Sequence, residues 1–340
     1  MKDKQTIYIR VDMNKEIATG HMMRCLSIAD EISELGGKVT FIIADRNACG
    51  LLENRGYEYI VLDTQWDDMD SEIPVMQKLV SNRNIEKLII DSYAATAKYL
   101  SAMTDVTYTM YIDDLNRTDL SVDAVLCYAI YTDKQVYTEN CAGRKVKLLL
   151  GTDYVPLRKV FQDIPPKTIN ENISNILILS GGSDPYRTIE KCIDVLSKDR
   201  TIQIHAICGR YSERASELRQ LYKEKSNVNI HESVEDIERY MQEADVCISA
   251  AGTTLYELCA CGTPTLSYIL ADNQIDNARG FDEKGIIPYL GDVRKEDIRK
   301  SINIELRTLE ESQKRRIVSG NMREVVDGKG CYRIASELIG

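Results

Sequence analysis

The fold of this chain is indicated first by residues 6–37, which read TIYIRVDMNKEIATGHMMRCLSIADEISELGG. The opening apolar run predicts a strand, the polar stretch Asp12–Thr19 a loop, and Met22–Leu35 a helix. In an α/β sheet, such a strand–loop–helix junction lies at the edge where ligands bind. Gly20 and His21 stand at this junction. Because an imidazole can accept a proton near neutral pH, His21 is the first candidate for a catalytic base.

Length and composition favour a globular protein of two domains. The chain has 340 residues, of which 44% are hydrophobic and 28% charged. A net charge of −10 and the lack of a basic run argue against nucleic acid as a partner. The N-terminus lacks the apolar core of a signal peptide, and no apolar stretch reaches the roughly 18 residues of a membrane span. We therefore expect a cytoplasmic protein with no integral membrane segment, of unknown oligomeric state.

Cysteine and histidine usage gives no sign of a metal site. The 10 cysteines are scattered, with no Cys-x-x-Cys pair. Cys259 and Cys261 are two residues apart, which on a helix points them in different directions. We expect reduced, mostly buried thiols in place of disulfides or a zinc site. The three distant histidines form no metal-ligand pattern, so we expect no metal and no cofactor.

Short apolar runs alternate with helical segments, which predicts mostly parallel sheets with helices on both faces. A Pro-Pro pair and a polar run predict a linker over 163–174, so the domains are 1–162 and 175–340. Two such units facing each other across a cleft suit enzymes that use nucleotide-linked donors. Strands are expected at Thr6–Ile9, Lys38–Ile43, Tyr57–Val61, Lys87–Ile90, Thr107–Ile112, Asn175–Leu179, Thr201–Ala206, Val228–Ile230, Val246–Ser249 and Thr265–Ile269. Helices are expected at Met22–Leu35, Ser71–Ser81, Tyr186–Leu196, Ile237–Ala244, Leu255–Cys261 and Gln274–Lys284.

Two junctions rich in small residues in the second half are candidate anion sites. Ser180–Pro185 follows a strand, with Asp184 as the expected helix N-cap and Pro185 as the first helical residue. Ser249–Thr254 leads into a helix whose free N–H groups can hold a diphosphate, and Glu257 on that helix can accept hydrogen bonds from ribose hydroxyls. A tight turn and a surface glutamate are the alternatives. Two such junctions in one domain favour a nucleotide site.

Tyr93 follows a strand and Arg158 comes just before the linker, and each has two interpretations. Tyr93 could bind a sugar or position a water, or it could be a half-buried aromatic residue. Arg158, placed near the cleft, suits a phosphate or carboxylate, or a structural ion pair. Asp113 and Asp114 are interpreted as a strand end. His205 fits a core position, and His231 a surface or interdomain position.

Taken in order, these motifs resemble the family of UDP-2,4-diacetamido-2,4,6-trideoxy-β-L-altropyranose hydrolases of pseudaminic acid biosynthesis, with relatives in spore-coat polysaccharide synthesis. That family is similar to the MurG-type glycosyltransferases. The resemblance covers nearly the whole chain. The motifs are Arg10-x-Asp12, Gly20-His21-x-x-Arg24, Asp91-x-Tyr93, Gly151-x-x-Tyr154-x-x-Leu157-Arg158, Gly181-Gly182-Ser183-Asp184, Ser249 to Glu257, Asn273-Gln274 and Asp327-Gly328-x-Gly330.

The resemblance implies an α/β protein of GT-B architecture, with two Rossmann-like domains and a cleft between them. It implies hydrolysis of a UDP-sugar, in which water attacks the anomeric carbon with inversion and without a metal. His21 would then activate the water, while Tyr93 and Asn273 shape the sugar site. Glu257 would hold the ribose and Arg158 would line the donor site. The remaining implied contacts with the substrate are Asp12, Gly20, Gly182, Ser183, Gly252, Thr253, Thr254 and Gln274.

Two other functions remain open from the sequence. One is a GT-B glycosyltransferase that uses the same UDP-sugar donor, and the other is a donor-binding subunit without catalysis. A transferase often has an apolar-basic membrane patch, and none is evident near the N-terminus, which favours the hydrolase. The chain departs from its relatives at Thr19, where they often have an apolar or aromatic residue, and in an extra segment after about Gly291.

Overall fold

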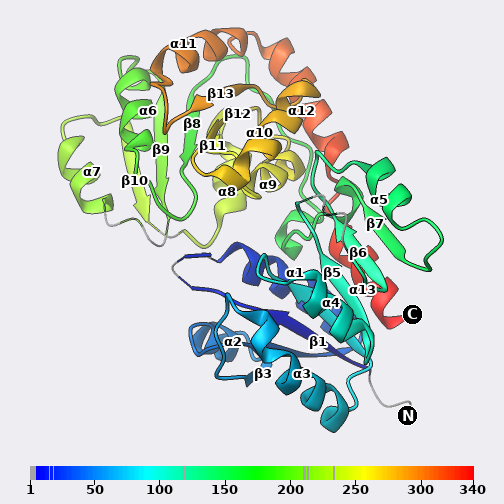
Figure 1. Cartoon of the computed structure of the whole chain (residues 1–340). Coiled ribbons are helices and arrows are strands. Elements are labelled where there is room, and N and C mark those ends of the chain that lie inside the picture. The colour runs from blue at the N-terminus through cyan, green and yellow to red at the C-terminus, as the bar shows by residue number, and fades with distance from the viewer. Residues whose placement is uncertain are drawn as a thin grey trace. The chain divides into compact units, whose positions relative to one another are not determined.

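The computed structural model describes residues 5–14, 16–17, 19–115, 117, 120–209, 212, 214–232 and 234–340. The chain divides into two compact units. Unit 1 comprises residues 1–159 together with 328–340, and unit 2 comprises residues 160–327. Each unit is a parallel sheet with helices packed on it (Figure 1).

Within its described residues, unit 1 has a seven-stranded sheet in the order β3-β2-β1-β4-β5-β6-β7, and every neighbouring pair is parallel. The strand order reverses between β1 and β4, as in doubly wound α/β folds. The elements are β1 (Thr6–Val11), α1 (Gly20–Glu34), β2 (Lys38–Ile43), α2 (Cys49–Asn54), β3 (Glu58–Val61), α3 (Met69–Arg83), β4 (Lys87–Asp91), α4 (Ala97–Thr104), β5 (Tyr108–Ile112), β6 (Ala124–Cys127), α5 (Lys134–Asn140), β7 (Lys147–Leu150), the 3-10 turn η1 (Thr152–Tyr154) and α13 (Gly330–Ile339).

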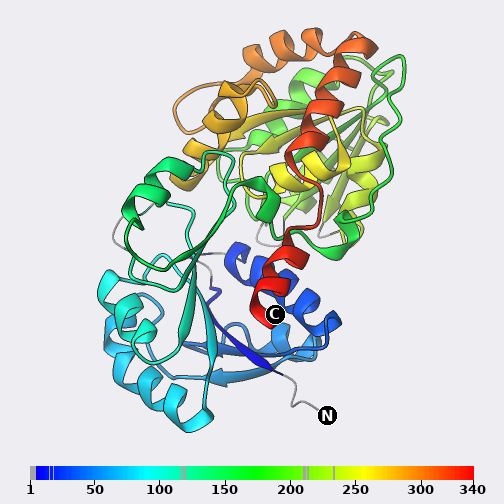
Figure 2. The same ribbon diagram turned by 90° about the vertical axis from the view of Figure 1, so that its right-hand side faces the viewer.

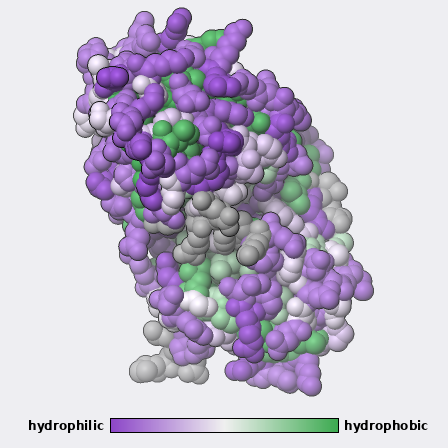
Figure 3. Space-filling model, turned by 90° about the vertical axis from the view of Figure 1, so that its left-hand side faces the viewer, coloured by the Kyte–Doolittle hydropathy of each residue, from purple (hydrophilic) through white to green (hydrophobic). Residues whose placement is uncertain are grey.

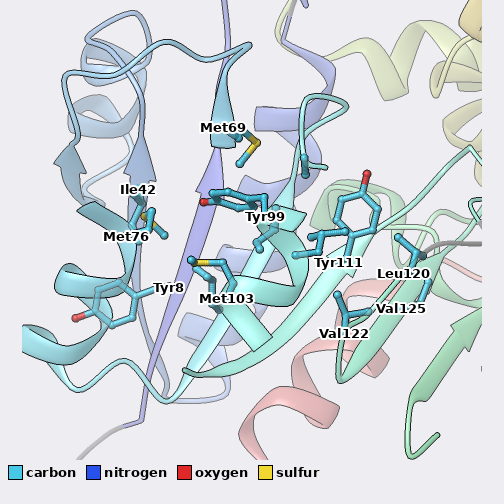
Figure 4. Packing of buried hydrophobic residues seen from close by; sticks show 14 of the residues in the cluster. Tyr8, Ile42, Met69, Met76, Tyr99, Met103, Tyr111, Leu120, Val122 and Val125 are labelled. Atoms are coloured by element: carbon cyan, nitrogen blue, oxygen red, sulfur yellow. The ribbon is translucent and has the colours of Figure 1, made fainter. Parts of the chain in front are cut away.

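Burial on both faces explains why the central strands of unit 1 are apolar along their length. In β4, Leu88, Ile89 and Ile90 are fully buried although their side chains alternate between the faces of the sheet. On one face, Tyr99 and Met103 of α4 pack with side chains of α3 and the strands (Figure 4). This packing fixes the strand ends that carry the polar residues described below.

Unit 2 repeats the arrangement with a six-stranded parallel sheet among its described residues, in the order β10-β9-β8-β11-β12-β13. The order reverses between β8 and β11. The elements are η2 (Lys159–Phe161), which starts at the last residue of unit 1, β8 (Asn175–Leu179), α6 (Thr188–Leu196), β9 (Gln203–Cys208), α7 (Ala215–Leu221), β10 (Val228–Glu232), α8 (Ile237–Glu243), β11 (Val246–Ala250), α9 (Thr254–Cys261), β12 (Thr265–Ile269), η3 (Asp272–Gln274), α10 (Ile275–Glu283), β13 (Tyr289–Asp292), α11 (Arg299–Thr308) and α12 (Ser312–Val325).

The C-terminal helix α13 belongs to unit 1, which differs from the expected domain of residues 175–340. It packs against α1 and η1, and Figure 2 shows the red helix beside the blue one. The Lys87 ammonium donates to the Leu338 carbonyl at 2.5 Å, and the Arg333 guanidinium donates to the Asp153 carbonyl at 2.8 Å. A Cβ on Gly330 would lie 2.1 Å from the Val155 carbonyl oxygen, so only glycine allows this approach.

The segment expected to be a linker, residues 163–174, is fastened to unit 2. The Asp245 carboxylate accepts hydrogen bonds from the backbone N–H groups of Ser174 and Asn175 and from the Asn170 side chain. The Arg315 guanidinium donates to the Asn170 carbonyl at 2.7 Å. These contacts hold the segment as part of the unit, and the boundary between the units falls earlier, after residue 159.

The ten cysteines all lie within the described residues and are all free thiols, nine of them buried and Cys49 half-buried. No helix in the described part of the chain is long and apolar enough to cross a membrane. The face in Figure 3 is mostly hydrophilic, with hydrophobic residues in small groups among the polar ones.

Candidate active site

The candidate site in unit 1 lies where β1 and β4 end side by side. The helix α1 begins after β1 and carries His21 as its second residue, while β4 ends with Asp91. In doubly wound folds, ligands bind at this reversal of strand order. The packed sheet therefore places His21 at the edge that the sequence predicts for it.

A hydrogen bond joins His21 to Asp91. The imidazole Nδ1 lies 2.5 Å from the carboxylate Oδ1, and Asp91 is only 1% exposed. Arg24 donates to the same carboxylate, from Nε to Oδ2 at 2.6 Å and from Nη2 to Oδ1. Nη2 is also 3.0 Å from Nδ1, as expected for two N–H donors that converge on one oxygen. We therefore assign the Nδ1–H tautomer to His21, which leaves Nε2 with its lone pair.

The Asp91 carboxylate is ionised. Burial alone would raise its pKa, but the charge of Arg24 and the hydrogen bonds from Arg24 and His21 lower the pKa well below its ordinary value. The neighbouring Cys25 donates from Sγ to Oδ2 at 3.3 Å, and burial and the Asp91 charge raise the pKa of this thiol well above its usual range. Asp91 is thus a fixed anion that orients three donors.

The other end of the Arg24 guanidinium contacts residues that follow the next two strands. Nη1 donates to Asp114 Oδ2 at 2.8 Å and to the Tyr128 hydroxyl at 2.6 Å. The guanidinium carbon is also 5.5 Å from the centroid of the Tyr128 ring. Arg24 therefore connects the ends of β4, β5 and β6.

Tyr93 forms the exposed wall beside His21. Its ring meets the imidazole edge-on, at 4.5 Å between centroids, and its hydroxyl donates to Asp114 Oδ2 at 3.0 Å. Tyr93 is 40% exposed, so part of the ring is free to contact a ligand. Its position beside the imidazole is compatible with the predicted role in a sugar site, which stays a prediction.

Asp12 lies in a different, buried network. Its Oδ1 accepts the Ala44 N–H at 2.7 Å and its Oδ2 pairs with Arg10. Arg10 in turn donates to both carboxylate oxygens of Glu72, at 2.8 and 3.0 Å. Because both oxygens of Asp12 are engaged and the residue is buried, these contacts favour a structural role over the predicted substrate contact.

In unit 2, the first junction is the loop after β8, and Gly209 in the loop after β9 packs closely against it. A Cβ on Gly209 would lie 2.0 Å from the Gly181 carbonyl oxygen, so the loops after β8 and β9 touch. Gly182 and Ser183 are exposed. The predicted helix start is wrong: α6 begins at Thr188, after Arg187 with φ 55°, and Pro185 lies outside it. The Asp184 carboxylate still accepts the leading N–H groups, at 2.7 and 3.0 Å.

The second junction, after β11, is held from α10. Asn277 donates from Nδ2 to the carbonyls of Ala251 and Gly252, at 2.9 and 3.2 Å, and its Oδ1 accepts the Tyr256 hydroxyl at 2.7 Å. The helix α9 begins at Thr254 and has no side-chain cap. The N–H groups of Leu255 and Tyr256 donate to the carbonyls of Gly252 and Thr253, at 3.1 and 3.0 Å, so an anion here would be favoured mainly by the positive end of the helix dipole.

The remaining predicted contacts of unit 2 lie at or near this junction. Gln274 approaches Gly252, with its Nε2 3.8 Å from where a Cβ of that glycine would stand, and its Oε1 accepts the Leu270 N–H at 2.9 Å. Asn273 is exposed in η3, and Glu257 is half-buried in the first turn of α9. Arg158 belongs to unit 1, half-buried between η1 and η2. Contact of these residues with a ligand stays a prediction.

The other two histidines form a pair in unit 2. Nδ1 of His205, on β9, lies 3.0 Å from Nε2 of His231, on β10, and Tyr240 of α8 packs edge-on against both rings. Both are half-buried, so the core position expected for His205 is not found, whereas a surface position for His231 agrees with its partial exposure.

Two Rossmann-like parallel sheets in succession define the GT-B class, and the solved structures agree. Acinetobacter baumannii MurG has a TM-score of 0.74, with 16% identity, over 99% of both chains. Within unit 2, residues 175–316 match the Glycosyltransferase family 28 C-terminal domain. The GT-B architecture expected from the resemblance is thus confirmed.

The sequence relatives are distant. The spore coat polysaccharide biosynthesis protein SpsG of Bacillus subtilis is 26% identical, over 76% of this chain and 78% of its own length. The pseudaminic acid cytidylyltransferase and UDP-2,4-diacetamido-2,4,6-trideoxy-beta-L-altropyranose hydrolase of Helicobacter pylori is 23% identical, over 78% of this chain. Protein MJ1062 of Methanocaldococcus jannaschii is 24% identical, over 79%. This chain spans only 45% of the Helicobacter protein and 56% of MJ1062. The relatives support the predicted relationship and leave the reaction open.

Three residues around His21 were not predicted as part of the site. The sequence indicates Arg24 and Asp91 only as members of motifs, and Asp114 only as the end of a strand. One signal could have found Arg24, since it lies three residues after His21 and so on the same face of the helix. The carboxylates at the ends of β4 and β5 could be linked to His21 only once the strand order is known.

Proposed function

We propose that this protein is a hydrolase that releases UDP from a UDP-diacetamido-trideoxy-hexose, in pseudaminic acid or related polysaccharide synthesis. The observation that supports this most is the His21–Asp91 pair, at 2.5 Å, with Nε2 left as a free acceptor at the ligand-binding edge of the sheet. The distant similarity to the Helicobacter pylori and Bacillus subtilis proteins suggests the substrate class. The cytoplasmic location and the lack of a metal requirement stay predictions.

The proposed reaction is a single displacement. The oxygen of a water attacks the anomeric carbon as Nε2 of His21 takes one of its protons, and the bond from that carbon to the diphosphate oxygen breaks. Asp91 stabilises the imidazolium that forms, through the hydrogen bond to Nδ1. The backbone N–H groups of Thr253 and Thr254 would donate hydrogen bonds to the leaving diphosphate and stabilise the charge that develops on it. Attack opposite the leaving group inverts the anomeric configuration.

A glycosyltransferase that uses the same UDP-sugar donor is the second candidate. It is favoured by the match of residues 175–316 to a glycosyltransferase domain. In that reaction His21 would take the proton of an acceptor hydroxyl in place of water. The two functions differ only in the nucleophile, so the test must identify it.

The test is incubation with the UDP-diacetamido sugar in water enriched in ¹⁸O, without any acceptor. We expect UDP release with ¹⁸O in the anomeric hydroxyl of the sugar and none in UDP. His21→Asn should lower turnover by roughly 10²–10⁴, the contribution of a positioned base, while UDP still binds. His231→Asn, a histidine of the other unit, serves as the matched control with near-normal turnover. UDP release that requires an added acceptor would contradict hydrolysis in favour of transfer.

A further inference from the structure

Arg24 is placed to control the charge of the candidate base. It lies one helical turn after His21 on α1 and is buried, so its guanidinium is held against the imidazole rather than free in water. Its Nη2 lies 3.0 Å from Nδ1 of the ring, and both atoms donate to the same oxygen of Asp91. The Asp91 carboxylate therefore accepts hydrogen bonds from both the Arg24 guanidinium and the His21 imidazole.

This arrangement affects both the tautomer and the charge of the imidazole ring. Asp91 accepts the Nδ1–H bond and thereby fixes the tautomer with a free Nε2. The same carboxylate would favour a second proton on the ring, because an opposite charge within about 4–6 Å stabilises the charged form. The guanidinium at 3.0 Å opposes that second proton, since an imidazolium would face a like charge.

We propose that Arg24 is a positioning residue that holds His21 in the Nδ1–H tautomer and opposes a second proton on the ring, by sharing Asp91 with it. The inference rests on the proposed function only in taking His21 as the base. Arg24 itself needs no contact with substrate for this role. The effect is electrostatic, so a positive charge at this place matters more than the shape of the guanidinium.

The other groups around the ring are consistent with this role. Tyr93 and Tyr128 add no charge, because burial raises the pKa of both hydroxyls above the usual range for tyrosine. Cys25 stays a neutral thiol for the same reason. Asp114 pairs with the far end of the guanidinium, at 2.8 Å, and so offsets part of its charge at the ring. The described charges that face the ring or its partners are Arg24, Asp91 and Asp114.

Two variants should move the His21 titration in opposite directions. In Arg24→Met the opposing charge is gone, so the ring should take up its second proton at a higher pH than in the wild type. In Asp114→Asn the guanidinium acts with less compensation, so protonation should occur at lower pH. Arg24→Lys retains a charge without the bidentate geometry and should lie between the wild type and Arg24→Met.

The experiment is an NMR titration of the imidazole nitrogens in the full chain without substrate. Only three histidines are present, and His21→Asn identifies the signals of His21. The ¹⁵N shifts should show the Nδ1–H tautomer in the wild type, and the His205 and His231 signals should stay in place in every folded variant. If Arg24→Met does not fold, Arg24→Lys and Asp114→Asn carry the test.

An Nε2–H tautomer in the wild type would overturn the inference. An unchanged midpoint of the His21 titration in Arg24→Met, or in both Arg24→Lys and Asp114→Asn, would also overturn it. The NMR titration is measured without substrate, so its outcome is independent of whether the protein releases UDP. An inactive chain with the expected titrations would reject the proposed reaction and retain the role of Arg24.

Discussion

Replacement of Asp91 by asparagine should destabilise unit 1 strongly. The carboxylate is buried and accepts from His21, from Arg24 through two nitrogens, and from Cys25. An asparagine side chain has one acceptor oxygen, and its NH₂ would face donors of Arg24. Breaking a buried ion pair from one side costs about 3–5 kcal/mol, so we expect a loss of this size in the free energy of unfolding.

The pH dependence gives a second, independent signature. The folded pKa of Asp91 is below its unfolded value, so ionised Asp91 contributes stability above about pH 4, and that stability is lost as the pH falls through the folded value. Asp91→Asn lacks this titration. The difference in stability between wild type and variant should therefore be largest near neutral pH and shrink in acid.

Urea unfolding followed by tryptophan fluorescence measures this, because the single tryptophan, Trp66, lies in unit 1. The control is Asp30→Asn, which removes an aspartate that pairs with Arg55 at the surface and should cost about 1 kcal/mol or less. Equal losses in the two variants would refute the reasoning. A loss for Asp91→Asn that stays constant from pH 7 to pH 3 would refute the electrostatic part of it.

Two further predictions concern unit 2. Glu257→Ala should weaken UDP binding by roughly 1–3 kcal/mol, the range for a hydrogen bond to a charged group, and calorimetry that finds unchanged affinity would reject the ribose contact. Burial lowers the pKa of His205 and of His231, so the unfolded chain binds more protons, and the stability that they contribute above about pH 6.5 is lost as the pH falls. His231→Gln should thus show a smaller fall in melting temperature between pH 7 and pH 5 than the wild type, and an unchanged fall would reject this role of the pair.

Sequence patterns were most reliable where a single element determines the outcome. The apolar strands β2, β8 and β12 were predicted with the bounds that the structure has, because each is a continuous buried run between polar ends. The four-residue strands β6 and β7 were missed, since runs this short do not differ from loop segments in periodicity.

The site shows the same limit. His21 could be found from its junction alone, because the junction is local in sequence. Its partner Asp91 is 70 residues away along the chain. Asp114, which pairs with Arg24, is 93 residues away from His21. Such contacts depend on strand order, which local periodicity does not contain. The start of α6 was predicted too early because Arg187 adopts a left-handed conformation that stops the helix from extending back to Pro185.

The return of α13 to unit 1 affects how the protein is made on the ribosome. All strands of the first sheet are synthesised by residue 150, but the helix that covers α1 follows only after unit 2. At about 5–20 residues per second, translation of residues 160–327 takes roughly 8–35 s, and for that time the nascent first sheet has one helix uncovered. The docking of α13 onto α1, which completes unit 1, thus comes after synthesis of the second sheet, whichever unit folds first.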